Sequence, residues 1–272
     1  MDAGFLERIA ACNRPPSAPG VAWVVGGQVV GALSTGLAAI VATLPGFTLE
    51  QGAVHLRPRP DDFDTRSRAL ADAHAALLAR GEAPPPRHEA FPVTPGNPWD
   101  ALCVMDRALV PRFGARAFGQ HVNGYVRRPD GGTDLWLGRR ARDRGNAPGR
   151  LDNMAAGGLP HAISLNDNLL KECWEEAAIP ADLARTAVPA GYVAYRGAVA
   201  GGVRHDILYC YDLEVPADFE PRCNDGEVDH YLLVDVQEAA RLVAETEVLK
   251  PNCTLVVIDF LVRHGLYRPE AP

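Results

Sequence analysis

Three glutamates in one short segment are the densest group of chemically capable side chains in this sequence. Glu172, Glu175 and Glu176 stand at positions i, i+3 and i+4, so on a helix their carboxylates share one face. Like charges at this spacing repel one another, and a divalent cation would relieve the repulsion. Mg²⁺ and Mn²⁺ prefer carboxylate oxygens as ligands. The spacing therefore predicts a magnesium or manganese site, the alternative being a solvated acidic helix face.

The elements around these glutamates are predicted to be a mixture of strands and helices. A helix over 166–178 carries the three carboxylates. Hairpins are expected where glycine-rich turns separate strand-like runs, at 117–127 with 133–139 and at 188–199 with 203–215. A strand at 228–234 and two helices, at 236–249 and 252–264, close the chain. This order predicts an α+β layered domain and not a regular βαβ alternation.

The first part of the chain has a different pattern of predicted elements. A helix is expected at 3–12, a hairpin at 21–33 around Gly26-Gly27, and a second helix over 61–81. A proline-rich stretch at 84–98 then interrupts the pattern, and a short helix at 106–113 is expected to belong to this first part. We therefore predict a small α+β domain at 1–115, with no assigned role, followed by a second domain at 116–272.

Composition and charge exclude several classes of protein. The chain has 272 residues, and 27 Lys and Arg against 34 Asp and Glu leave a formal charge of −7, which disfavours binding to nucleic acid. The longest apolar stretch, near 32–45, is too short and interrupted to span a bilayer. Six scattered cysteines and an N-terminus without a signal-peptide pattern predict a cytoplasmic protein with free thiols and no membrane partner.

The segment that carries the glutamates resembles the Nudix box. That pattern is a glycine, five residues, a glutamate, seven residues, and then Arg-Glu-apolar-any-Glu-Glu-any-Gly-apolar. With Gly157 on the first glycine, the three helical glutamates coincide with those of the pattern. Three residues depart from it: Ile163 replaces the first glutamate, Lys171 the arginine and Ala178 the late glycine. We expect Asp167 to pair with Lys171 one turn later, and an alanine to form a poor left-handed helix cap.

The resemblance extends over most of the chain. The stretches 118–125, 151–158, 224–228 and 252–265 are similar to Nudix proteins that have an extra N-terminal domain and are related to, or fused with, thiamine pyrophosphokinase. The resemblance implies the Nudix fold, a mixed sheet between helices in an α/β/α sandwich. It also implies metal-dependent hydrolysis of a small organic diphosphate, with damaged or oxidised thiamine diphosphate as substrate and the monophosphate as product.

The resemblance assigns roles to the acidic residues. Glu172 and Glu176 ligate Mg²⁺ or Mn²⁺, Glu175 completes or bridges the site, and the backbone carbonyl of Ala156 is a further ligand. Glu227, in a loop before a strand, is expected to act as general base or as another metal ligand. We count Glu175, Glu176 and Glu227 as the candidate catalytic residues.

Residues of the neighbouring segments are candidates for binding the substrate. Arg139 and Arg140 end a strand in which adjacent side chains point to opposite faces, so at most one of them is expected to reach a phosphate. The other candidates are two residues on one strand face, one residue before the glycines, and the glycines themselves: His121, Asn123, Asn153, Gly157 and Gly158. Asp152 and Trp136 are secondary candidates, and Asn252 is expected to be a helix cap.

Two other functions remain open. The Nudix box indicates that the substrate has a diphosphate, but it does not indicate which organic group is attached, so a nucleotide-sugar or coenzyme A diphosphatase is an alternative. The departures at Ile163 and Ala178 also leave room for a binding module without turnover. A homodimer is compatible with the sequence.

Overall fold

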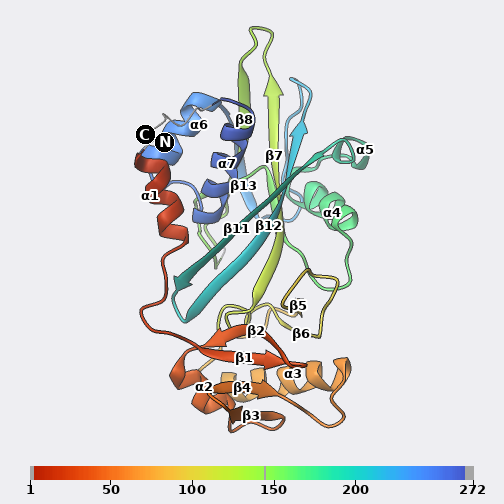
Figure 1. Ribbon diagram of the computed structural model, residues 1–272. Helices are drawn as coiled ribbons and strands as arrows, with labels where there is room; N and C mark the ends of the chain where they lie inside the picture. The colour runs from red at the N-terminus through yellow and green to blue at the C-terminus, as the bar shows by residue number, and fades with distance from the viewer. Residues whose placement is uncertain (1–2, 144, 267–272) are drawn as a thin grey trace.

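A computed structural model describes residues 3–143 and 145–266 of the chain. In it a small N-terminal unit lies against one end of a larger unit built on a long, twisted sheet (Figure 1). Each unit has its own core of buried apolar side chains. No helix in the described part is long and apolar enough to cross a membrane.

The N-terminal unit is a four-stranded sheet with two helices, followed by a separate strand pair. The sheet has the order β2-β1-β4-β3, in which β1 and β4 are parallel. Its elements are β1 (Val21–Val25), β2 (Gln28–Leu33), α2 (Thr35–Val41), β3 (Phe47–Glu50), β4 (Ala53–Leu56) and α3 (Phe63–Ala79), and the pair is β5 (Ala90–Val93) and β6 (Cys103–Asp106). The predicted two-glycine turn is confirmed, because Gly26 and Gly27 both have positive φ.

The larger unit is built on a seven-stranded mixed sheet. Its main path is β11-β12-β7-β8-β13, and β7 and β12 run parallel. β10 pairs with the first half of β7, and β9 pairs with the end of β8. The strands are β7 (Arg116–Arg127), β8 (Thr133–Arg140), β9 (Leu151–Asp152), β10 (Ala155–Gly158), β11 (Val188–Val199), β12 (Gly202–Glu214) and β13 (Val228–Asp235).

Helices cover both faces of this sheet. On one face lie α4 (Leu165–Ala177) and the short α5 (Ala181–Ala184), and on the other lie α6 (Val236–Glu245) and α7 (Pro251–Arg263) (Figure 1). Separate apolar clusters join each helix layer to the sheet. The predicted α/β/α arrangement with a preceding α+β domain is therefore confirmed.

The first helix, α1 (Ala3–Cys12), packs on the larger unit although it precedes the smaller one in sequence. Phe5 is fully buried in the cluster formed with α6 and α7, and Cys12 lies in a cluster with Leu255 and Val256 of α7. The chain thus starts on the larger unit, builds the smaller one, and returns.

The predicted helix at 106–113 is wrong. Asp106 ends β6, and its carboxylate accepts hydrogen bonds from the backbone N–H groups of Arg87, His88 and Ala108 at 2.8–3.1 Å. Such side-chain acceptors favour turns over helix, and the following residues form a series of turns. The predicted helix at 236–249 also ends earlier, at Glu245.

The helix that carries the glutamates begins and ends as its sequence allows. Ser164 caps the N-terminus by accepting from the Asp167 N–H at 3.0 Å, and Ala178 ends the helix in the left-handed conformation with φ 50° and ψ 32°. The Ala178 N–H donates to the Trp174 carbonyl, which is the 5→1 bond of an αL cap, and the Ile179 N–H donates to the Cys173 carbonyl.

Ala178→Gly is expected to raise the free energy of unfolding by about 1 kcal/mol, because glycine adopts this conformation without the steric cost that an L-residue bears. In a thermal melt this corresponds to an increase of roughly 2–4 °C in Tm. Ala177→Gly, one residue earlier and inside the helix, is the matched change and should lower Tm instead. A decrease in Tm for Ala178→Gly would contradict a strained cap.

Candidate functional site

The acidic face of α4 lies against strand β10. Leu169, Cys173 and Ala177 form the neighbouring stripe of the helix, which is buried in the core. This orientation turns Glu176 inward, where its side chain is 4% exposed and accepts a hydrogen bond from the Ala156 N–H at 2.7 Å. The helix and the strand are thus joined by one of the candidate metal ligands.

Gly157 makes room for a second carboxylate. A Cβ built at this glycine would lie 2.0 Å from the Cδ of Glu172 and closer than 2.5 Å to both of its carboxylate oxygens. The side chain of Glu172 therefore lies directly over the backbone of Gly157, in space that only a glycine leaves free. The first glycine of the motif positions this carboxylate by having no side chain of its own.

Lys171 pairs with the acidic face instead of with Asp167. Its ammonium lies 3.1 Å from Glu172 Oε1 and 2.9 Å from Glu175 Oε2. Asp167 accepts from the Ser164 hydroxyl at 2.7 Å and is part of the helix cap. The expected Asp167–Lys171 pair is wrong because the N-terminal cap takes this carboxylate, and the lysine contributes positive charge beside the glutamates.

The four candidate glutamates line one cavity of about 450 Å³. Its wall holds Glu172, Glu175 and Glu176 from α4 and Glu227 from the loop before β13, together with the backbone of residues 156–158. The remaining charged residues of the wall include five cations: Arg87, Arg107, Arg140, Lys171 and Lys250. The carboxylates thus face an open space and not the protein interior alone.

Burial and mutual repulsion raise the pKa values of the two inner glutamates. For Glu176 the main cause is burial, and the charges of Asp152, Glu172 and Glu227 add to it. For Glu172 burial again comes first, and the charges of Glu175 and Glu227 raise its pKa further, against the effect of Lys171. Carboxylates that repel one another in a partly buried cavity bind a cation more strongly than separate carboxylates do.

One of the two predicted arginines reaches this cavity. Arg140 is 7% exposed, contacts Glu227 at 3.7 Å and lies 3.1 Å from Asp152. Arg139 points the other way and donates to the Gly149 carbonyl at 2.6 Å, outside the lining of the cavity. The expectation that at most one of the pair faces the site agrees with this alternation.

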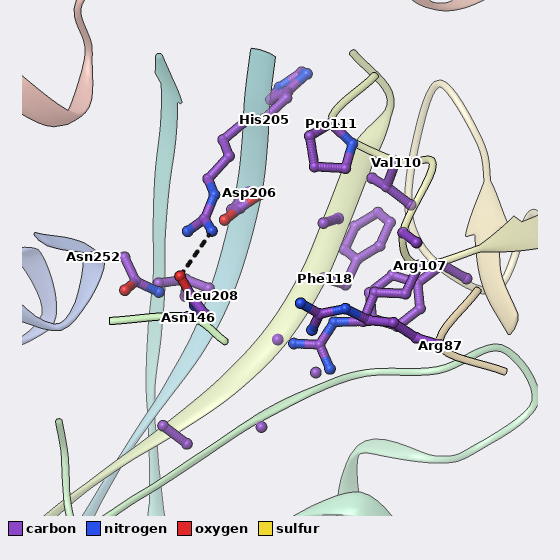
Figure 2. Close-up of a pocket in the computed structure, with 18 of the residues that line it drawn as sticks. Arg87, Arg107, Val110, Pro111, Phe118, Asn146, His205, Asp206, Leu208 and Asn252 are labelled. Carbon is purple, nitrogen blue, oxygen red and sulfur yellow. Dashed lines mark hydrogen bonds between the residues drawn. The ribbon is translucent and has the colours of Figure 1, made fainter. Parts of the chain in front are cut away.

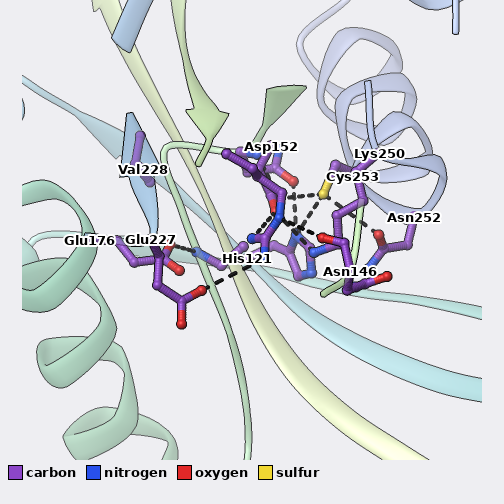
Figure 3. A network of polar contacts seen from close by, with 12 residues as sticks. His121, Asn146, Asp152, Glu176, Glu227, Val228, Lys250, Asn252 and Cys253 are labelled. Carbon is purple, nitrogen blue, oxygen red and sulfur yellow. Dashed lines mark hydrogen bonds and ion pairs between the residues drawn. The ribbon is translucent and has the colours of Figure 1, made fainter. Parts of the chain in front are cut away.

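The predicted polar residues of β7 belong mainly to a buried network (Figure 3). His121 contacts Asn153 Oδ1 at 2.8 Å, and Asn153 in turn donates to Asn123 Oδ1 at 2.9 Å. Asn123 is fully buried and donates to Asp212 at 3.0 Å. The structure brings His121 to the wall of a neighbouring hollow, but it leaves Asn123 and Asn153 inside the core.

That hollow, of about 220 Å³, continues from the glutamate cavity and shares residues 156–158 with it (Figure 2). One side is formed by β7 and β12, and the other by the segment 84–111 of the N-terminal unit. Sequence reasoning missed most of its functional groups: Arg87, Phe91, Arg107, Asn146, Arg204, Asp206 and Lys250. Asn252, expected as a cap, instead lies within the first turn of α7 and faces this hollow, while Trp136 packs near Tyr231.

Comparison with known proteins identifies the second part of the chain. The family model described as "NUDIX domain" matches residues 117–253, and one described as "Domain of unknown function (DUF4743)" matches residues 4–117. Nudix hydrolase 24, chloroplastic, of Arabidopsis thaliana is 42% identical over 274 residues, which is 99% of this chain and 75% of that protein. The chain belongs to the Nudix hydrolase family. The expected class of enzyme, a Nudix pyrophosphohydrolase, is thereby confirmed.

Two further relatives match over most of the chain. Nudix hydrolase 20, chloroplastic, of Arabidopsis thaliana is 39% identical over 280 residues, covering 98% of this chain and 75% of that protein. The uncharacterized protein YJR142W of Saccharomyces cerevisiae is 29% identical over 240 residues, covering 82% of this chain and 69% of that protein. The matches therefore include the N-terminal unit as well as the Nudix domain.

The prediction of a cytoplasmic protein is wrong by this comparison, since both plant relatives are named as chloroplastic proteins. The prediction rested on scattered free cysteines and on the first few residues. Free thiols are compatible with any reducing compartment, so they do not distinguish the cytoplasm from another one.

Nudix hydrolases use divalent metal ions, and the glutamate cavity has the chemistry to hold one. Its carboxylates are hard oxygen ligands, and burial together with neighbouring carboxylates raises the pKa values of Glu172 and Glu176. Among the described residues, the group with ligand atoms within 4.8 Å of one another is a different one: His121, Asp152 and Cys253.

This buried trio is poorly suited to a metal ion. Asp152 already contacts the Lys250 ammonium at 2.9 Å and the Arg140 guanidinium at 3.1 Å, and the Cys253 thiol donates to it (Figure 3). Burial lowers the pKa of His121 to about 4 and raises that of Cys253, so the imidazole is neutral and the thiol keeps its proton. A metal ion would have to enter beside two fixed cations, so we read the trio as structural.

Proposed function

We propose that this Nudix hydrolase cleaves the diphosphate of a small organic molecule with the help of a divalent cation held by the glutamates of α4. The observation that carries the proposal is the cavity that Glu172, Glu175, Glu176 and Glu227 line together. A solvated acidic face would instead leave Glu176 exposed, whereas it is buried and held by the Ala156 N–H.

Each carboxylate has a role in this proposal. Glu172 and Glu176 would hold the cation, Mg²⁺ or Mn²⁺, and Glu175 and the backbone carbonyl of Ala156 would be further ligands. Glu227, whose side chain is 35% exposed and lies near Arg140, is placed to take a proton from the attacking water or to serve as a further ligand. Arg140 neutralises part of the charge on Glu227 and orients it.

The reaction is a hydrolysis in which the chain's residues position the reactants. When bound, the cation supplies positive charge beside the diphosphate and makes a water more acidic. Water adds to one phosphorus atom, the bridging P–O bond breaks, and the products are an organic monophosphate and inorganic phosphate. The cationic side chains on the cavity wall stabilise the negative charge on the phosphoryl oxygens.

For the organic group we propose damaged or oxidised thiamine diphosphate, which yields the monophosphate. The support is the resemblance of stretches outside the Nudix box to the subfamily that is related to thiamine pyrophosphokinase. A nucleotide sugar or coenzyme A is the alternative substrate. We also propose the division into domains at 1–115 and 116–272, and a homodimer as the assembly to be tested.

A screen of phosphate release tests this function. Thiamine diphosphate, its oxidised forms, nucleotide sugars and coenzyme A are incubated with the protein and with Mg²⁺ or Mn²⁺, followed by phosphatase treatment where the product is a monoester. We expect the thiamine compounds to be hydrolysed fastest and chelation of the metal to stop turnover. If another diphosphate is hydrolysed faster, the proposed substrate is wrong. No turnover with either metal would favour a binding module.

A further inference from the structure

The hollow next to the glutamate cavity has two walls from different parts of the chain. Strands β7 and β12 of the Nudix domain form one wall with Phe118, Leu208 and Asp206, and the N-terminal domain forms the other with Phe91 and Val110. The wall residues from the N-terminal domain come from the segment before β5, from β5 itself and from the turns after β6; β5 and β6 lie between the two units (Figure 1).

We propose that this hollow binds a ring-bearing organic group, and that Arg87 of the N-terminal domain binds the diphosphate attached to it. The N-terminal domain then forms half of the substrate site. The inference rests on the proposed diphosphatase function, because it assumes that the phosphates lie at the glutamates.

The lining of the hollow fits a planar nitrogen heterocycle. Phe91 and Phe118 are aromatic, Val110 and Leu208 are aliphatic, and all four are less than 5% exposed. The Asp206 carboxylate and the side-chain amide of Asn252 add hydrogen-bonding groups to the same lining. Ligand sites typically combine an apolar wall with a few placed polar groups in this way.

The two domains meet closely at Gly158. A Cβ at this glycine would lie 2.9 Å from the Phe91 ring and 3.2 Å from the Arg107 guanidinium. Arg107 stacks over Phe91 at 5.3 Å from the ring centroid and pairs with Glu89 at 2.8 Å. Gly158, which follows the first glycine of the Nudix box, thus allows the N-terminal domain to reach the site.

Arg87 is the cation of the cavity wall that is available to an anion. Lys250 and Arg140 both contact Asp152, Lys171 contacts the glutamates, and Arg107 contacts Glu89. Within the described ranges, 3–143 and 145–266, the guanidinium of Arg87 has neither an ion pair nor a hydrogen bond. Figure 2 shows the Arg87 and Arg107 side chains directed into the same space. Arginine is well suited to bidentate contact with phosphate.

The experiment measures two dissociation constants in the presence of Mg²⁺, one for thiamine diphosphate and one for methylenediphosphonate, a diphosphate analogue without a ring. Ala108 lines the hollow and is partly exposed, so Ala108→Trp places a large ring there. We expect this variant to weaken thiamine diphosphate binding by about tenfold or more and to leave methylenediphosphonate unchanged. Arg87→Gln should weaken both ligands by about tenfold, since it removes a charge-assisted contact.

Matched controls are available on the same domain. Ala79→Trp and Arg80→Gln, at the exposed end of α3, make the same changes away from the hollow and should leave both constants as in the unchanged protein. The inference is overturned if Ala108→Trp leaves thiamine diphosphate binding within about twofold, or if Arg87→Gln leaves methylenediphosphonate binding within about twofold. Both constants are binding measurements, so they separate this inference from the proposed function, which fails if turnover is absent.

Discussion

Glu176→Gln is expected to lower the rate of diphosphate hydrolysis by roughly a thousandfold or more while the protein stays folded. The amide oxygen of glutamine can still accept the Ala156 N–H, which now donates at 2.7 Å to the carboxylate. The substitution removes the negative charge that would bind the cation. Metal assistance lowers the activation barrier by several kcal/mol, and each loss of about 1.4 kcal/mol slows the reaction tenfold. The measurement is kcat at saturating Mg²⁺.

A second readout separates metal binding from other causes of inactivity. A ligand that binds the folded state raises Tm with its concentration, so Mg²⁺ should raise the Tm of the unchanged protein more than that of Glu176→Gln. The control is Glu238→Gln, which removes the same charge from a surface pair with Arg241. Hydrolysis by Glu176→Gln at a rate within about twofold of the unchanged protein would show that the metal assignment is wrong.

The part of the site that lies within α4 could be predicted from the sequence because its geometry is local. The helical period alone places Glu172, Glu175 and Glu176 on one face, and the buried stripe with Cys173 decides which way that face turns. The end of this helix is local in the same sense, although the sequence favoured a left-handed cap at Ala178 only weakly.

The rest of the site is set by contacts between distant segments. Asp152 and Lys250 are 98 positions apart, and no spacing rule connects them. Asn123 has the residue type and strand position of a ligand contact, but Asp212 on the neighbouring strand and Asn153 bind its side chain in the core. A strand pattern shows which residues share a face, but it does not show whether that face meets a cavity or a helix.

The N-terminal contribution was the least accessible to prediction. Arg87 lies within the proline-rich stretch 84–98, which has neither helical nor strand periodicity, and Arg107 follows β6. The four-residue strands β5 and β6 are too short to show a periodicity. Their place against the Nudix sheet depends on how two separate cores pack. Gly158 offered the only local indication, since a glycine pair before a helix indicates close approach of another group as well as a turn.

Gly157→Ala is expected to reduce hydrolysis by about a hundredfold or more at a cost in stability of only about 1 kcal/mol. The φ angle of Gly157 lies outside the left-handed region, so alanine fits its backbone. The new methyl group would, however, lie 2.0 Å from Glu172 Cδ, and the carboxylate would have to move. Because this carboxylate is the end of a flexible side chain, it can move aside at little cost in stability, but the site then loses a metal ligand.

A double-mutant cycle tests this cause directly. If the methyl group acts only by displacing Glu172, then Gly157→Ala should have almost no further effect on kcat in a Glu172→Gln background, so the two substitutions are strongly non-additive. Gly36→Ala is the control, because nothing lies within 4 Å of a Cβ at that helical position, and it should leave the rate unchanged. Additive losses in the cycle would mean that Gly157 serves the reaction by some route other than the placement of Glu172.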